Sequence, residues 1–107
     1  MANARNLQYS AINTSSSGNT TIVAAQTVAG QPAFIKIWAL WIVIAGITNI
    51  TFYDGITALS GAAPMVANGS MFFAPGTVPW LTASPNNAFI MNSSAGVQIS
   101  GGVVWSL

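Results

Sequence analysis

The feature that most constrains the fold of this 107-residue chain is its alternation of short apolar runs with turn-forming residues from Thr21 onward. This spacing is typical of a β-sandwich or β-barrel. Asp54-Gly55 and Asn68-Gly69 are strong hairpin signals, because these residue types tolerate positive φ. No segment shows helical periodicity. The sequence therefore predicts an all-β chain, folded as a single antiparallel β-sandwich of about eight short strands.

The longest predicted strand covers residues 34–44, and strict alternation divides its side chains between two faces. These faces consist of Phe34, Lys36, Trp38, Leu40 and Ile42, and of Ile35, Ile37, Ala39, Trp41 and Val43. Both sets are apolar apart from Lys36, whereas a half-exposed strand would alternate with polar residues. We therefore expect the domain core to cover one face, and a second subunit or an assembly surface to cover the other. The final predicted strand, residues 97–105, contains Gly101-Gly102 as an expected bulge.

The N-terminal residues 1–21 are small, polar and non-periodic, and include the low-complexity stretch SSSGNTT. A segment of this composition cannot bury enough apolar surface to fold alone. It is either a disordered tail or an extended arm that becomes ordered against a neighbouring subunit. We predict an arm at residues 1–21 and a β-sandwich domain at residues 22–107.

Charged side chains are almost absent: only Arg5, Lys36 and Asp54 carry charge, and the chain contains no Cys or His. Soluble proteins normally have about a quarter charged residues. A neutral surface on a chain that is 52% hydrophobic promotes association, which predicts a homo-oligomer. The scattered charges form no basic stripe, so nucleic acid is not an expected partner.

The apolar run at residues 37–47 raises the question of a membrane span. It is well short of the roughly 20 residues that a transmembrane helix requires. Its β-branched and aromatic residues fit a buried strand better. We therefore predict no membrane partner, and a small membrane-active protein built on this run is the least favoured alternative.

Catalytic chemistry has few candidate residues in this sequence. Acid–base catalysis requires a titratable group, and the candidates are Asp54, Lys36, Tyr9 and Tyr53. Asp54 lies in a turn dipeptide, where Asp commonly bonds the backbone. No paired carboxylates, metal-ligand clusters or phosphate-binding glycine loops are present. We predict that the chain is not an enzyme and has no catalytic residue, cofactor or metal.

The tryptophans allow two interpretations. Exposed aromatic rings can stack on sugars, whereas buried ones supply area to a core or an interface. Trp38 and Trp41 have opposite alternation and cannot both face one core, so at least one is expected to anchor an interface. Together with neighbouring residues, the predicted interface consists of Phe34, Lys36, Trp38, Leu40, Trp41, Val43 and Trp80.

Three stretches carry a family resemblance: VAGQPAFIKIWALWIVIAG, ITFYDGITALSGAAPMVANGS and PWLTASPNNAFIMNSSAGVQISGGVVWSL. Their order resembles that of the small β-sandwich capsid decoration (cement) proteins of tailed bacteriophages, from about Ala24 to the C-terminus. The resemblance implies a jelly-roll-like sandwich and a homo-oligomer, often a trimer, on the outer surface of the virion capsid. Trp38, Trp41 and the low charge depart from the family pattern. No catalytic residue is carried over.

The leading hypothesis is therefore a structural virion protein that stabilises the phage head by bridging copies of the major capsid protein. The alternative is a receptor- or glycan-binding module on a phage tail or fibre, which recognises its ligand through exposed aromatic residues such as Trp80.

Overall fold

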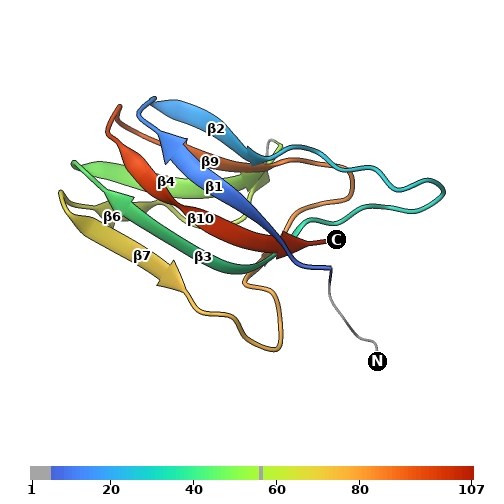
Figure 1. Cartoon of the computed structure of the whole chain (residues 1–107). Coiled ribbons are helices and arrows are strands. Elements are labelled where there is room, and N and C mark those ends of the chain that lie inside the picture. Colours follow the sequence, from blue (N-terminus) through green and yellow to red (C-terminus); the bar gives the residue numbers. More distant parts are fainter. Residues whose placement is uncertain (1–5, 56) are drawn as a thin grey trace.

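The computed structural model describes residues 6–55 and 57–107, which form ten β-strands and no helix. The strands make two antiparallel sheets that pack face to face as a β-sandwich (Figure 1). This confirms the all-β prediction. Three of the ten strands, β5, β6 and β8, are only two or three residues long.

Each sheet has five strands. Sheet A contains β1 (Gln8–Thr14), β10 (Ile99–Ser106), β3 (Lys36–Ile44) and β7 (Gly69–Phe73), in this order, and β8 (Leu81–Thr82). Sheet B contains β2 (Gly18–Val23), β9 (Phe89–Ser93), β4 (Thr48–Asp54) and β5 (Thr57–Ala58), in this order, and β6 (Ala63–Met65). The short strand β8 continues the edge that β7 occupies on β3, and β6 does the same beside β5 on β4.

The pairing follows a simple rule along the chain. Strand β1 pairs with β10, β2 with β9, β3 with β7 and β8, and β4 with β5 and β6. From β1 to β4, successive strands alternate between the two sheets. The chain therefore resembles one long antiparallel hairpin that has been wrapped into two layers, with its tip near the turn that follows β4.

The core lies between the two sheets and consists almost entirely of aliphatic and aromatic side chains. Phe52 of β4 and Phe89 of β9 stack with ring centroids 5.4 Å apart. The buried cluster consists of Ile12, Val23, Ile35, Ile37, Leu40, Ile42, Ile44, Ile50, Phe52, Ala83, Phe89, Met91, Ile99, Val103 and Trp105. It contains residues of both sheets, so each sheet has one face in the core and an outer face.

The predicted N-terminal arm is wrong for residues 8–14 and 18–21, because these residues are strands of the sandwich. All of β1 pairs with β10, and β2 pairs with β9, so the predicted domain boundary falls inside β2. The inward positions of β1 are mostly polar, and Ser10 Oγ accepts a hydrogen bond of 3.0 Å from Trp105 Nε1. A polar edge strand of this kind lacks the apolar alternation that marks a strand in a sequence. Residues 1–5 of the predicted arm lie outside the described residues.

A β-bulge in β3 determines which side chains of the long strand face the core. Ala39 is opposite Val104 and Ile37 is opposite Trp105, so Trp38 is the extra residue of β3. The bulge reverses the alternation, and both Ile37 and Leu40 therefore face inward. The two faces that strict alternation predicts are wrong for this reason.

The bulge predicted at Gly101-Gly102 is also wrong, because these residues keep continuous register with Ile42 and Trp41. The two glycines instead allow atoms of neighbouring strands to approach closely. A Cβ on Gly101 would overlap the carbonyl group of Trp41 on the adjacent strand. Glycine therefore permits β10 to lie closely against β3 at this point.

Candidate functional site

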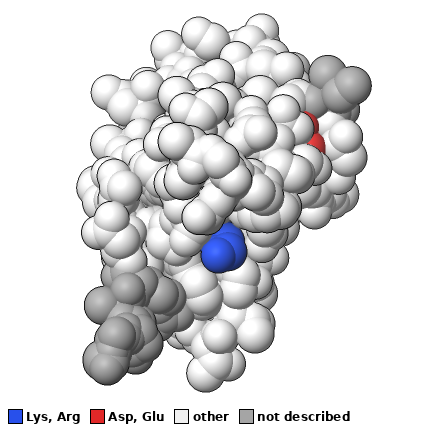
Figure 2. Space-filling model, turned by 90° about the vertical axis from the view of Figure 1, so that its right-hand side faces the viewer, with Lys and Arg blue, Asp and Glu red and all other residues white. Residues whose placement is uncertain are grey.

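The surface of the described chain is nearly free of charge. Of its ionisable side chains other than tyrosine, Asp54 is buried and Lys36 is half-buried. In Figure 2 the described residues of one face are white apart from one small basic and one small acidic patch. Binding through this surface has to depend on apolar contacts and neutral hydrogen bonds. Within residues 6–55 and 57–107, no helix is long and apolar enough to cross a membrane.

The outer face of sheet A carries large exposed aromatic side chains. Tyr9 of β1 is 60% exposed, Trp41 of β3 is 46% exposed and Phe72 of β7 is 68% exposed. Trp41 and Phe72 are direct partners in the register of β3 and β7. Val43 follows Trp41 on the same face and is equally exposed. We call Tyr9, Trp41, Val43 and Phe72 the aromatic strip.

Gly102 of β10 allows the strip to cross the sheet without interruption. A Cβ at this position would overlap the phenol ring of Tyr9, so the ring lies against the β10 backbone. Gly102 is also the register partner of Trp41 on β3. The strip therefore crosses β1, β10, β3 and β7, which are the four successive strands of sheet A (Figure 1).

Neutral polar side chains border the strip at one end. The next outward row of the sheet contains Asn13, Ser100 and Ser70 beside Val43. Gln98 Nε2 donates to Asn13 Oδ1 at 2.7 Å and to Ser100 Oγ at 3.1 Å. An apolar centre with a polar border is the usual composition of a protein–protein interface.

The structure divides the predicted interface residues between the surface and the core. Trp41 and Val43 lie on the outer face, whereas Leu40 is only 1% exposed and belongs to the core. Trp38 is also buried, and its Nε1 donates to Ser106 Oγ at 2.8 Å. Leu40 and Trp38 are therefore removed from the predicted interface, because the bulge turns one inward and packs the other beside β10.

The remaining predicted residues lie away from the centre of the strip. Phe34 precedes β3 and is 36% exposed, and Lys36 is the first residue of β3. Sequence reasoning missed Tyr9 and Phe72. Tyr9 lies in the segment interpreted as an arm. Phe72 could have been found from its alternation with Met71 and Phe73, which are half-buried on the opposite side of β7.

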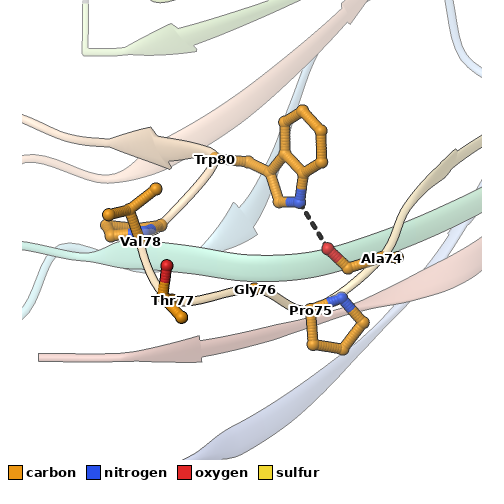
Figure 3. A pocket seen from close by; sticks show the side chains of 7 residues that line it. Ala74, Pro75, Gly76, Thr77, Val78 and Trp80 are labelled. Carbon is orange, nitrogen blue, oxygen red and sulfur yellow. Dashed lines mark hydrogen bonds between the residues drawn. The ribbon is translucent and has the colours of Figure 1, made fainter.

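Trp80 belongs to a different surface, at the edge of the sandwich beyond β7. Its ring stacks on Phe73 with centroids 4.8 Å apart, and Phe73 packs against the core. Figure 3 shows its indole directed toward Ala74, whose carbonyl accepts a 2.6 Å hydrogen bond from Nε1. These contacts close residues 74–80 into a loop around an open hollow of about 460 Å³. Thr77 supplies the hydroxyl group among the residues that line it.

Asp54 makes a hydrogen bond to the backbone of a distant loop. Its Oδ2 accepts a 2.6 Å hydrogen bond from the backbone N–H of Ser84, which ties the end of β4 to the loop before β9. The Oδ1 atom is buried and makes no hydrogen bond to the described residues. The described residues contain no cluster of three His, Cys, Asp or Glu side chains that would suit a metal ion.

Comparisons of the chain with protein-family models, with curated proteins and with solved structures find no match. Its function has to be inferred from its own surface. The most distinctive feature of that surface is the aromatic strip on a neutral sheet face. Contiguous exposed apolar patches on soluble proteins commonly mark interaction sites.

Proposed function

We propose that this chain is a structural virion protein, a capsid decoration (cement) subunit that stabilises a phage head by bridging major capsid proteins. The observation that carries the proposal is the aromatic strip on the uncharged outer face of sheet A. The strip gives the subunit an assembly surface that acts through burial of apolar area, without a catalytic reaction. The assignment to a virion, and to its capsid, rests on the sequence resemblance.

The strip sets the scale of the binding energy. With about 200 Å² per aromatic ring, the exposed fractions of Tyr9, Trp41 and Phe72 leave on the order of 350 Å² of aromatic surface. At about 25 cal/mol per Å², its burial contributes on the order of 9 kcal/mol. Association costs about 4–15 kcal/mol, so the free energy gained from burying one strip is about equal to this cost. Repetition of the contact around a shell raises the effective concentration and makes binding stable.

The strand pairing supports the jelly-roll part of the proposal. A jelly roll is a two-sheet sandwich in which Greek-key connections carry the chain between the sheets. The alternation of β1 to β4 between sheets A and B, with the second half of the chain returning beside the first, agrees with this arrangement. The resemblance also implies a homo-oligomer, with a trimer favoured, on the outer capsid surface.

The neutral surface is better suited to protein partners than to nucleic acid or anionic lipid. Phosphate-binding surfaces rely on clusters of Lys and Arg. In the part of the chain that the structure describes, Lys36 is the only such residue. A protein surface of similar neutral and apolar character is the partner that fits.

The proposal is tested by immunogold labelling of purified virions with an antibody to this chain. Label spread over the head is the expected result. Label restricted to the tail tip would overturn the capsid role in favour of receptor binding. Particles that carry no label would exclude both virion roles.

The second candidate function is glycan binding on a tail or fibre, which the 51% exposure of Trp80 beside the loop hollow favours. Against it, Trp80 has one ring face against Phe73 and its N–H already bonds Ala74. Sugar sites also require several convergent polar groups, and the hollow offers few. Glycan-array binding that Trp80→Ala abolishes and Trp41→Ala preserves would establish this function.

A further inference from the structure

We infer that the outer face of sheet A docks a second copy of this chain, face to face, about a two-fold axis parallel to the strands. The inference deepens the self-association included in the proposed function, replaces the trimer that the resemblance favours with a two-fold pair, and does not depend on the capsid role. The observations that carry it are the distribution of large and small side chains on this face and the absence of charge near its centre.

One row of side chains crosses the four main strands of sheet A at the same level. From β1 to β7 it consists of Ala11, Gly102, Trp41 and Phe72. The two small residues lie on β1 and β10, and the two large aromatic residues lie on β3 and β7. With about 4.8 Å between strands, the row is about 14 Å wide. One half of the face is therefore low and the other half is raised.

A two-fold rotation matches the raised half to the low half. If the axis runs along the strands between β10 and β3, the rotation turns the face over and reverses the strand order. Trp41 then lies opposite Gly102 of the second copy, and Phe72 lies opposite its Ala11. A two-fold interface is self-complementary, so both matches occur twice. Stacked sheets are about 10 Å apart, a gap that a large side chain opposite a small one fills.

Tyr9 supplies the surface that Trp41 of the other copy would meet. Its ring lies against the backbone at Gly102, as the overlap with an added Cβ shows. The low half of the face therefore carries a flattened ring, and the indole of the second copy can pack on it. Aromatic pairs with centroids about 4.5–7 Å apart stabilise beyond their buried area.

The electrostatics of the face also favour a second copy. Two identical surfaces normally bring like charges together, but the centre of this face has none. Lys36 is the first residue of β3 and lies opposite Ser106, four positions of β10 from Gly102, the partner of Trp41, or about 13 Å along the strand. At this distance it lies at the border, where water and salt screen its charge. The strip then forms the apolar centre, and the Asn13–Ser100 row forms the polar border.

The area is also suitable for a pair of chains. A stable interface buries about 800 Å² on each partner, and the strip supplies on the order of 350 Å² of it as aromatic surface. Exposed Val43, Asn13 and Ser100 beside the aromatic rings add to this area. Because this arrangement buries the strip between two copies, the shell contact of the proposed function then falls to the loops at the end of the sandwich, which include exposed Ile47 and Val66.

The first test is sedimentation equilibrium of the full chain over a range of concentrations. We expect a dimer. Ala11→Asp, which places two carboxylates against apolar partners, should weaken it about 100-fold or more. The control Val78→Asp adds the same charge at an exposed loop position and should leave the dimer unchanged. A monomer, a trimer, or a dimer that tolerates Ala11→Asp would overturn the inference.

A second test determines the orientation of the two copies. The chain contains no Cys, so the double variant Ala11→Cys/Phe72→Cys introduces the only thiols. Within one chain the two positions are about 14 Å apart, too far for a disulfide, which needs Cα atoms within about 7 Å. Oxidation should link two chains, since directly opposed residues of facing sheets can approach more closely than the mean sheet spacing, as the inter-sheet disulfide of immunoglobulin domains shows.

Ala11→Cys alone is the matched control and should not link, because residue 11 faces residue 72 of the other copy. A dimer of the double variant that fails to link on oxidation would overturn the two-fold arrangement. Virion labelling is an independent measurement, so a capsid protein that is monomeric in solution would contradict this inference and leave the proposed function standing.

Discussion

Two neighbouring residues of β3, Leu40 and Trp41, provide the sharpest test of how the sandwich is built. Strict alternation from the start of the strand places Leu40 on the same face as Lys36, whereas the bulge at Trp38 turns Leu40 into the core. Substituting each residue with Ala should therefore change a different property of the protein. Leu40→Ala should affect stability, and Trp41→Ala should affect association.

The magnitudes follow from burial. Leu40 is 1% exposed, and buried Leu→Ala substitutions cost about 2–5 kcal/mol. In a domain of about 100 residues, each kcal/mol lowers Tm by roughly 4–8 °C, so Leu40→Ala should lower it by at least about 10 °C. Trp41 is 46% exposed and is not part of the buried cluster, and at about 25 cal/mol per Å² the buried half of about 200 Å² is worth at most about 2.5 kcal/mol, so Trp41→Ala should cost less than Leu40→Ala.

Urea unfolding, followed by far-ultraviolet circular dichroism at a concentration where the chain is monomeric, gives both free energies of unfolding. Sedimentation equilibrium of the same proteins gives the association constants. The reasoning is refuted if Trp41→Ala destabilises the monomer more than Leu40→Ala. That result would mean that the strand faces the other way and that the bulge is misplaced.

The remaining predictions concern β10, the buried carboxylate and salt. Gly101→Ala should lower the free energy of unfolding by about 2 kcal/mol or more in urea titrations, because the added methyl overlaps the Trp41 carbonyl and separates two strands; an unchanged value would contradict the close approach. Asp54→Ala should cost about 1–3 kcal/mol in the same titration, because the Ser84 N–H loses its acceptor, and Asp54→Asn should cost less because it keeps an acceptor. Equal costs would show that the hydrogen bond is unimportant. Self-association measured by sedimentation should change little with sodium chloride concentration and should strengthen in ammonium sulfate, as burial of uncharged apolar surface requires. A steep loss of association in sodium chloride would indicate ion pairs in place of the aromatic strip.

The sequence was a good guide wherever the physical signal was local. Asp54-Gly55 forms the predicted hairpin, because β4 pairs with β5 and Gly55 has a positive φ of 65°. Asn68 has a positive φ of 64° as well, but its turn joins β6 of sheet B to β7 of sheet A, so the hairpin predicted there is wrong. The long apolar stretch is a strand with one face in the core and with Trp41 exposed on the other. Local backbone preferences and strand alternation are properties of a few adjacent residues, so the sequence alone shows them.

The N-terminal strand was missed because its signal is not local. β1 and β2 are polar edge strands, and their place in the sandwich depends on β10 and β9, which are distant in the sequence. Ser10 of β1, for example, bonds the indole of Trp105. Polar alternation of this kind looks like a disordered segment until its partner strands are known.

The sequence by itself determined that this chain is all-β, nearly uncharged, and rich in apolar strands that need covering. Only the tertiary structure decided which side of each strand is covered. A single extra residue at Trp38 reverses the alternation of β3, and the chain's wrapping brings Tyr9, Trp41 and Phe72 onto one face. The physical reason is that side-chain direction alternates with every residue, so a shift of one position exchanges core and surface.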